Sequence, residues 1–265
     1  HMGNLLIPYE ANRVGDPGFD HRYFVDGPVV VGDTYGTDGW KTSLVGTAGA
    51  GGRSVFALDV SDPSKFGKEN LLWELSDMDK SLDDDVLNHI GHVLGKPVIV
   101  PVRGATDGSV SFKAIFGNGV DSKSGKAVLF VVSMEKNRKP TFHVYVAEEA
   151  GNKLPAGKNG LMNIVVVDRW GGTGEKQPAR DGFADTVYGA DQKGAIWKFD
   201  LRGTDKPTKP LFTTKTSVDA DGQTYRQPIM GGMTATAGAA GGVMLMFGTG
   251  SFSFLEDRQD TSVQS

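Results

Sequence analysis

The sequence predicts an all-β fold, a β-propeller of four-stranded antiparallel blades that is modified or incomplete as a ring. The main observation is a recurring pattern in which an apolar run, a glycine-rich turn and a second apolar run follow one another. It occurs at 42–60, 113–132 and 186–201, and its first half returns at 243–250. This pattern is typical of a β-hairpin, and its return every ~60–70 residues indicates a propeller. The 37 glycines agree with a fold of many tight turns.

Each unit contains strand-like segments, which are apolar or β-branched runs bounded by Gly, Pro, Asn or Asp. In the first unit we expect strands at 27–32, 41–47, 54–60 and 71–75. In the second unit we expect them at 96–103, 112–116, 127–133 and 141–147. The third unit has candidates at 162–168, 185–188, 195–200 and 210–214, and the fourth begins with 227–235 and 242–247. Four strands per unit is the blade pattern of a propeller.

The two ends of the sequence lie outside these units. Residues 1–2 are interpreted as left from expression, 3–20 as a lead-in segment, and 21–265 as a propeller domain from a longer protein. The lead-in has one short apolar run at 5–7, interpreted as a remnant strand, and the chain turns polar after 254. About three and a half blades do not close a ring. Either further blades are missing, or the fold is a modified propeller with an open edge.

One segment, 77–92, has helical periodicity. Leu82, Val86 and Ile90 recur at every fourth position, which places them on one face of a helix. The aspartates at 83–85 would stabilise its first turn by interacting with the positive end of the helix dipole. The alternative is a charged loop between blades.

The composition excludes several classes of protein. The chain is 38% hydrophobic and 23% charged, as in ordinary globular proteins. Its net charge of −4 gives no global basic field for binding nucleic acid or an anionic membrane. It contains no cysteine and no apolar stretch near the ~20 residues of a membrane helix, so we expect neither disulfides nor a transmembrane segment.

The most promising candidate site is an acidic loop before the strand at 185–188. Asp181 and Asp185 lie four residues apart, with the Phe183 carbonyl between them, and Asp168 joins them if the loop folds back. Calcium prefers six to eight oxygen ligands from closely spaced carboxylates and carbonyls. The loop is therefore a candidate calcium site, and the alternative is a simple β-turn at 181–182.

Other candidate groups favour structural roles. His89 and His92 are spaced to share a metal on a helix, but no third ligand completes the set, so we interpret them as core or solvated histidines. The glycines at 49–52 precede a strand-like run, which favours a hairpin turn over a phosphate-binding loop. Trp40 and Trp170 lie in predicted turns and are candidates for a partner surface. The sequence contains no recognisable Ser/His/Asp catalytic motif.

Five motifs in register resemble one known family. They are the segments 21–30, 49–60, 116–119, 187–191 with 197–201, and 247–250, and the resemblance covers 21–264. Together they are similar to the C-terminal β-propeller domain of the PilC/PilY family of type IV pilus proteins. The resemblance implies a non-enzymatic module that is exported to the outer membrane, pilus tip or cell surface. It also implies roles in pilus assembly against retraction, twitching motility and adhesion, with minor pilins and a host-cell surface as partners.

The same resemblance bears on the acidic loop. Many family members carry a calcium loop of pattern Asp-x-Asp/Asn-x-Asp-x-x-x-Asp before the equivalent strand. Asp168 matches its first position, Asp181 its third acidic position and Asp185 its last, while Phe183 matches the carbonyl ligand. This chain inserts 169–180 where the family has a short acidic turn, so one acidic ligand is missing or comes from Glu175.

An alternative function is an oxidoreductase on a quinoprotein-like propeller. The repeat at 188–200, Tyr-Gly-Ala-Asp-x-x-Gly-x-Ile-Trp-Lys-Phe-Asp, also resembles quinoprotein blade motifs. A cofactor site would need a closed propeller with convergent polar groups. The incomplete blade count and the lack of an acid/base set favour the binding module.

Overall fold

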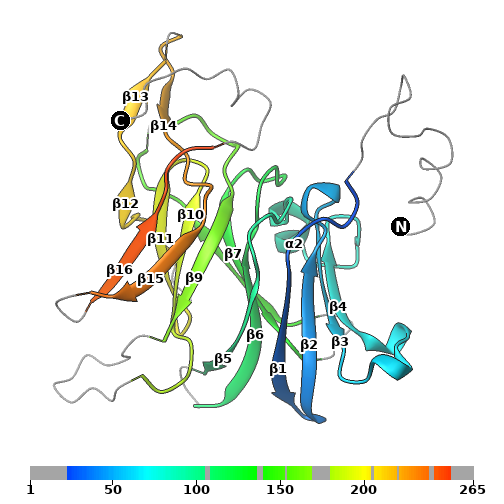
Figure 1. The fold of residues 1–265 in the computed structure, drawn as a ribbon. Coiled ribbons are helices and arrows are strands. Elements are labelled where there is room, and N and C mark those ends of the chain that lie inside the picture. The colour runs from blue at the N-terminus through cyan, green and yellow to red at the C-terminus, as the bar shows by residue number, and fades with distance from the viewer. Residues whose placement is uncertain are drawn as a thin grey trace, which may run out of the picture.

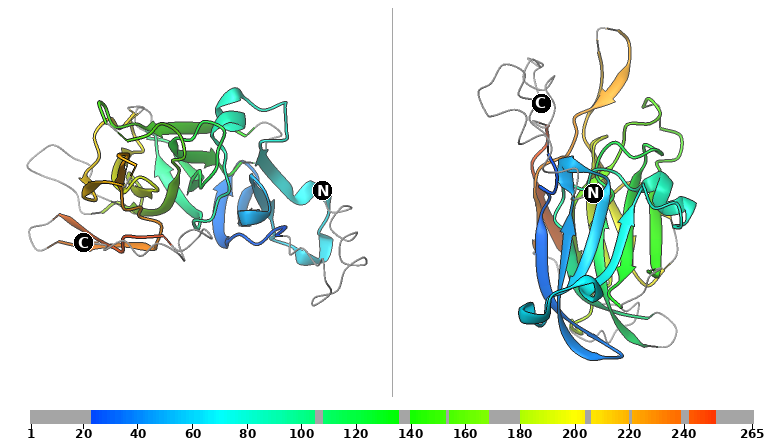
Figure 2. Two further views of the ribbon diagram at one scale, coloured as in Figure 1. Left: turned by 90° about the horizontal axis from the view of Figure 1, so that it is seen from above. Right: turned by 90° about the vertical axis from the view of Figure 1, so that its right-hand side faces the viewer.

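The structure is a computed structural model that describes residues 23–251, except 105–107, 136–139, 153, 169–179, 204–205, 220 and 239–241. The strands form three four-stranded and two two-stranded antiparallel sheets. The four-stranded sheets and one of the two-stranded sheets stand side by side as propeller blades (Figures 1 and 2). The predicted all-β propeller fold is confirmed. No helix in these described ranges is long and apolar enough to cross a membrane.

The blades follow chain order. The first contains β1 (Val29–Gly36), β2 (Gly39–Thr47), β3 (Ser54–Asp59) and β4 (Leu71–Ser76). The second contains β5 (Val98–Arg103), β6 (Val110–Gly117), β7 (Ala127–Ser133) and β8 (Phe142–Ala147). The third contains β9 (Leu161–Val167), β10 (Thr186–Asp191), β11 (Ala195–Asp200) and β12 (Phe212–Thr213). The fourth has the pair β15 (Met233–Ala237) and β16 (Val243–Phe247).

We call the end of the blades at which β2, β6 and β10 finish the upper end, and the opposite end the lower end (Figure 1). A hairpin of β13 (Thr216–Val218) and β14 (Thr224–Arg226) rises beyond the upper end (Figures 1 and 2). This hairpin was not predicted from the sequence because its strands are short and polar. Its turn is instead fixed by Asp219, whose carboxylate accepts hydrogen bonds from two backbone N–H groups.

Most predicted strands occur within a few residues of their expected positions, and two need correction. The strand expected at 210–214 shrinks to the two residues of β12, because only Phe212 and Thr213 pair with β11. The strand expected at 227–235 begins only at Met233. Pro228 lacks a backbone donor, and Gly231-Gly232 interrupts the run, so pairing starts after them. The remnant strand expected at 5–7 lies outside the described residues.

The helix expected over 77–92 is shorter in the structure, where α2 spans only Asp84–His89. Three short 3₁₀ turns lie elsewhere in the described chain, namely η2 (Gly49–Gly51), η3 (Pro63–Lys65) and η4 (Lys68–Asn70). Leu82, Val86 and Ile90 are buried, as their spacing predicts. The helix ends early because the next residues bond to the second blade instead. Gly91 N–H donates to the Asn118 carbonyl at 3.0 Å, and His92 N–H donates to the Val120 carbonyl at 2.8 Å.

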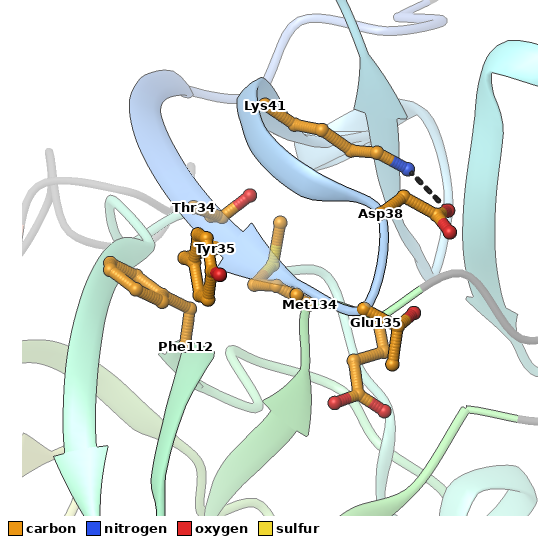
Figure 3. A pocket seen from close by; sticks show the side chains of 9 residues that line it. Thr34, Tyr35, Asp38, Lys41, Phe112, Met134 and Glu135 are labelled. Carbon is orange, nitrogen blue, oxygen red and sulfur yellow. Dashed lines mark hydrogen bonds and ion pairs between the residues drawn. The ribbon is translucent and has the colours of Figure 1, made fainter.

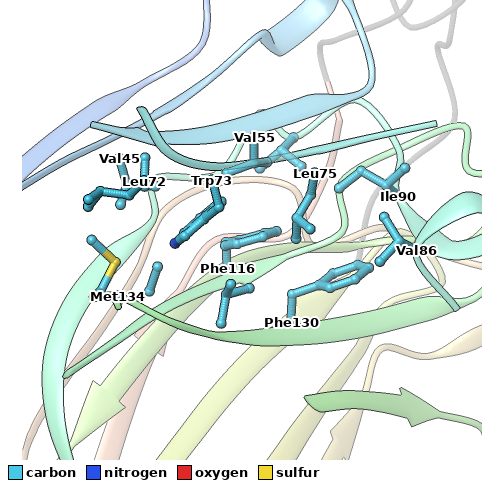
Figure 4. Close-up of a cluster of buried hydrophobic side chains, with 14 of the residues drawn as sticks. Val45, Val55, Leu72, Trp73, Leu75, Val86, Ile90, Phe116, Phe130 and Met134 are labelled. Atoms are coloured by element: carbon cyan, nitrogen blue, oxygen red, sulfur yellow. The ribbon is translucent and has the colours of Figure 1, made fainter. Parts of the chain in front are cut away.

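The blades have no cores of their own, because each apolar core lies between two blades. The core between the first and second blades contains Trp73, Phe116 and Phe130 (Figure 4). The rings of Phe116 and Phe130 stack at a centroid distance of 5.4 Å. A second core joins the second and third blades, and a smaller one around Ile196 and Ile229 joins the third and fourth.

Strand β7 shows why the second blade depends on both neighbours. Val128, Phe130 and Val132 belong to the core shared with the first blade. Leu129 and Val131 alternate with them and belong to the core shared with the third. Successive side chains of a strand point to opposite faces of the sheet, so a strand covered on both faces is apolar throughout.

Asn118 joins the second blade to the third with a completely buried side chain. Its Oδ1 accepts hydrogen bonds from Val128 N–H at 3.0 Å and from Leu161 N–H, at the start of the third blade, at 2.9 Å. Its Nδ2 donates to the carbonyls of His89 at 2.8 Å and Lys126 at 3.0 Å. One amide therefore satisfies backbone groups of three segments that would otherwise be buried without partners.

We predict that Asn118→Ala lowers the free energy of unfolding by about 2–4 kcal/mol, because it leaves several buried backbone groups unpaired. Asn152→Ala, at an exposed turn, is the control and should change it by less than about 0.5 kcal/mol. Urea denaturation followed by tryptophan fluorescence measures both. Equal effects of the two substitutions would contradict the joining role of Asn118.

Candidate functional site

The predicted acidic loop connects β9 to β10 at the lower end of the third blade. Asp168 directly follows β9, and 181–185 leads into β10. Gly182 adopts φ +85°, so 181–182 is a turn that favours glycine. Glu175, the alternative ligand, lies outside the described residues.

Asp168 faces the turn. Its Oδ2 accepts a hydrogen bond from Gly182 N–H at 2.8 Å. Its Oδ1 is buried and has no hydrogen-bond partner within the described part of the chain. A buried carboxylate oxygen without a donor is unfavourable, and a cation is one group that would satisfy it.

Asp181 is bound to the neighbouring blade. Its Oδ2 lies 3.4 Å from Nε of Arg103, which ends β5 of the second blade. The Arg103 guanidinium also lies over the Phe183 ring, 4.2 Å from its centroid. Ala184 N–H donates to the Pro101 carbonyl at 2.9 Å, which adds the loop to the edge of β5. We call these contacts of Arg103 the arginine clasp.

Asp185 is buried, at 8% exposure, and belongs to the third blade. Its Oδ1 accepts a hydrogen bond from the Thr186 hydroxyl at 2.9 Å, and its Oδ2 lies 3.9 Å from Nη2 of Arg202. A guanidinium therefore stands near this carboxylate as well. The sequence analysis considered the acidic residues of this loop and missed both arginines, which come from distant positions along the chain.

The fit of this loop to calcium is partial. Over the described ranges, no three His, Cys, Asp or Glu side chains gather as they would around a metal ion. Asp168 offers an unpaired oxygen, while Asp181 and Asp185 lie beside guanidinium groups. Calcium needs several oxygen ligands at 2.3–2.6 Å. The loop can therefore bind calcium through Asp181 and Asp185 only after their ion pairs with Arg103 and Arg202 break.

The two histidines singled out in the sequence make separate hydrogen bonds. His89 Nδ1 lies 2.8 Å from the Ser124 hydroxyl, and His92 Nδ1 lies 2.9 Å from the Gly49 carbonyl oxygen. Both rings are half-buried, and burial lowers the pKa of His89 below its usual value. The glycines at 49–52 form the predicted turn between β2 and β3.

Trp40 is 68% exposed and lies beside Tyr35 and Phe112, with ring centroids 5.3 Å and 6.0 Å away. A small pocket adjoins these rings at the lower end of the first two blades, with Tyr35, Phe112 and Met134 on one side and the Lys41–Asp38 ion pair on the other (Figure 3). Its volume of about 100 Å³ is well below that of ordinary ligand sites. Trp170, the other predicted surface tryptophan, lies outside the described residues.

Hydrogen bonds give Asp191, at the end of β10, a structural role. Its carboxylate accepts hydrogen bonds from Trp197 Nε1 at 2.8 Å, from the backbone of Ala195 and Lys193, and from Asn159 Nδ2. Burial raises the pKa of this carboxyl, although the four donors favour its charged form. The Gly-Ala-Asp segment of the repeat thus holds the turn between β10 and β11.

We predict that Arg103→Gln loosens the segment 181–185, because it removes an ion pair and a cation–π contact between blades. The partners are partly exposed, so the free energy of unfolding should fall by about 0.5–1 kcal/mol. Trypsin should cleave after the exposed Arg180 several-fold faster. Lys65→Gln, which removes an exposed ion pair to Asp62, is the control, and equal cleavage rates would contradict the clasp.

Comparison with known proteins assigns the chain to a family. The family model of the PilY1 beta-propeller domain matches residues 10–264. A type IV pilus biogenesis factor PilY1 homolog of Xylella fastidiosa is 37% identical over 275 residues, covering 98% of this chain and 17% of the relative. The type IV pilus biogenesis factor PilY1 of Pseudomonas aeruginosa strain UCBPP-PA14 is 34% identical over 202 residues, covering 76% of this chain and 15% of the relative.

A solved structure supports the assignment. The crystal structure of the Pseudomonas aeruginosa PilY1 C-terminal domain aligns with a TM-score of 0.62 at 27% identity, covering 88% of this chain and 46% of that chain. This chain therefore spans less than half of the solved domain and about a fifth or less of the curated relatives. On the match over 10–264, this chain belongs to the PilY1 β-propeller domain family.

Proposed function

We propose that this chain is a non-enzymatic docking module of a type IV pilus biogenesis factor. The observation that carries the proposal is the match to the PilY1 β-propeller domain along nearly the whole chain. The relatives that bear the name of biogenesis factor are several times longer than this chain, so the module would act as part of a larger protein. It would be exported and work at the outer membrane, the pilus tip or the cell surface.

The fold suits docking better than catalysis. Blades that share their cores hold the connecting loops on a rigid frame, and binding residues are commonly placed on such loops. The β13–β14 hairpin, with Val218 63% exposed and Tyr225 42% exposed, projects from this frame (Figure 1). Asp191, the most buried carboxylate of the described chain, is held by four donors as a structural group. Minor pilins and a host-cell surface are the proposed partners, in assembly, twitching motility and adhesion.

We expect the function to fail when the module is removed from its parent protein. Deleting the codons for 23–251 from the parent gene should abolish surface pili, twitching and adhesion, because the docking frame is lost. If the module opposes retraction, pili should return when retraction is also blocked. Lys65→Gln in the full-length protein is the control. Normal pili and adhesion after the deletion would contradict the proposed function.

Calcium would act on the module through the acidic loop. The candidate ligands are Asp168, Asp181, the Phe183 carbonyl and Asp185, and Asp168 Oδ1, which has no hydrogen-bond partner among the described residues, supports a cation there. The ion would compete with Arg103 for Asp181, so binding would open the arginine clasp between the second and third blades. Calcium would then modulate the module by reordering this loop.

Titration calorimetry tests the competition. We expect calcium to bind with a dissociation constant in the millimolar range. Arg103→Gln should tighten binding about threefold, because it frees Asp181, while Asp168→Asn should abolish the heat. Lys65→Gln should leave both unchanged. No heat from either the unchanged protein or Arg103→Gln up to about 10 mM calcium would overturn calcium modulation and leave the pilus module proposal standing.

A further inference from the structure

The largest of the cavities described here lies at the upper end, where loops of three successive blades meet. Its volume is about 650 Å³, within the range of sites that hold small ligands or peptide side chains. It is lined by the loop after β6, the segment before β9 and the segment before β15. It opens on the side of the molecule opposite to the acidic loop, so the two features are independent.

The charged residues that line this pocket are two lysines and one aspartate, and the aspartate is the one that has an ion-pair partner among the described residues. Lys123 and Lys158 line it, are exposed, and form no ion pair with any described residue. Asp121, the acidic residue of the lining, is bound by Arg53 of the first blade, which also pairs with Asp77 at 3.3 Å. Within the described residues, the two ammonium groups beside the cavity thus have no carboxylate partner, in a protein whose net charge is −4.

The rest of the lining combines apolar residues with uncharged polar ones, among them Gln192. Val120 is 7% exposed, and the half-buried Pro228 and Met230 face the same cavity from the fourth blade. The hydroxyls of Ser122 and Ser124 lie on the same loop as Val120. None of the described lining residues is aromatic, so the stacking surface typical of saccharide sites is absent from this part of the chain.

The backbone of the pocket is strained at two charged residues. Asp121 has φ +58° and Lys158 has φ +48°, and these are the non-glycine residues of the described ranges with positive φ. Both line the pocket. Glycine adopts this conformation without strain, so a charged residue that occupies it is a candidate for a functional side chain.

We propose that this pocket binds an acidic, extended segment of a partner protein. Carboxylates of the segment pair with Lys123 and Lys158, and a neighbouring apolar side chain packs on Val120, Pro228 and Met230. Charge complementarity selects the acidic segment, and the apolar lining selects its neighbour. The β13–β14 hairpin ends at Arg226, two residues before Pro228 of the pocket lining. This inference goes beyond pilus assembly, since it assigns a ligand class to one surface.

The test uses a defined probe, acetyl-leucyl-glutamyl-leucinamide, titrated into the isotope-labelled chain and followed by amide chemical shifts. We expect saturable shifts that centre on 120–125, 157–160 and 228–230. The neutral acetyl-leucyl-glutaminyl-leucinamide should bind at least about threefold more weakly, because an exposed ion pair is lost. No saturable shift up to about 10 mM probe, or equal binding of both peptides, would overturn the proposal.

Substitutions locate the binding charges. Lys123→Gln and Lys158→Gln should each weaken binding of the acidic peptide about threefold, and the double variant about tenfold. Lys65→Gln, the same charge change at the lower end, should leave binding unchanged. An equal effect of Lys65→Gln would reveal nonspecific attraction and overturn the site.

Lys158→Gly separates binding from structure. It relieves the strained φ, so the melting temperature should rise or stay level, while binding of the acidic peptide should weaken about threefold. If Lys158 had only a structural role, its replacement by glycine would not weaken peptide binding. Glucuronate serves as a third probe, and saturable binding of glucuronate in the absence of peptide binding would overturn the choice of a protein partner.

Discussion

The burial of both faces of the second blade is the constraint on which the rest of the structure depends. Its strand β7 is apolar at successive positions, so it is stable only between two other sheets. Apolar burial contributes about 25 cal/mol per Å², and here each contribution is shared between two blades. A blade therefore cannot be removed or shifted without exposing the core of its neighbour.

Close approach of neighbouring segments explains the glycines at 117 and 119. A side chain at Gly117 would put its Cβ 2.3 Å from the Leu161 carbonyl oxygen, and one at Gly119 would meet the His92 carbonyl oxygen at 1.9 Å. Between these glycines, Asn118 carries the polar link to the third blade. Glycine permits these contacts and Asn118 satisfies the backbone there, so the segment 117–119 marks the junction of the second and third blades.

The sequence predicts the fold well because the fold depends on local and repeated features. Strand β7 is predicted with its observed bounds, since its apolar run has clear polar ends. The extent of α2 could not be predicted, because Gly91 and His92 bond to residues about 27 positions later along the chain. The candidate loop was found by its carboxylates, whereas its partners Arg103 and Arg202 come from other strands and turns that only the folded chain brings near.

The acidic loop and the upper pocket differ in whether the charges proposed to bind a ligand have partners among the described residues. At the lower end, Asp181 is held by Arg103, so any cation that binds there must first displace a guanidinium. At the upper end, Lys123 and Lys158 are exposed beside a cavity, and a carboxylate that approaches them displaces only water and counterions. A charged side chain that already forms an ion pair must break it before it binds a ligand, whereas a side chain without an ion-pair partner need not. On both proposals, a ligand at the lower end would therefore have to compete with an existing ion pair, whereas a ligand at the upper pocket would not.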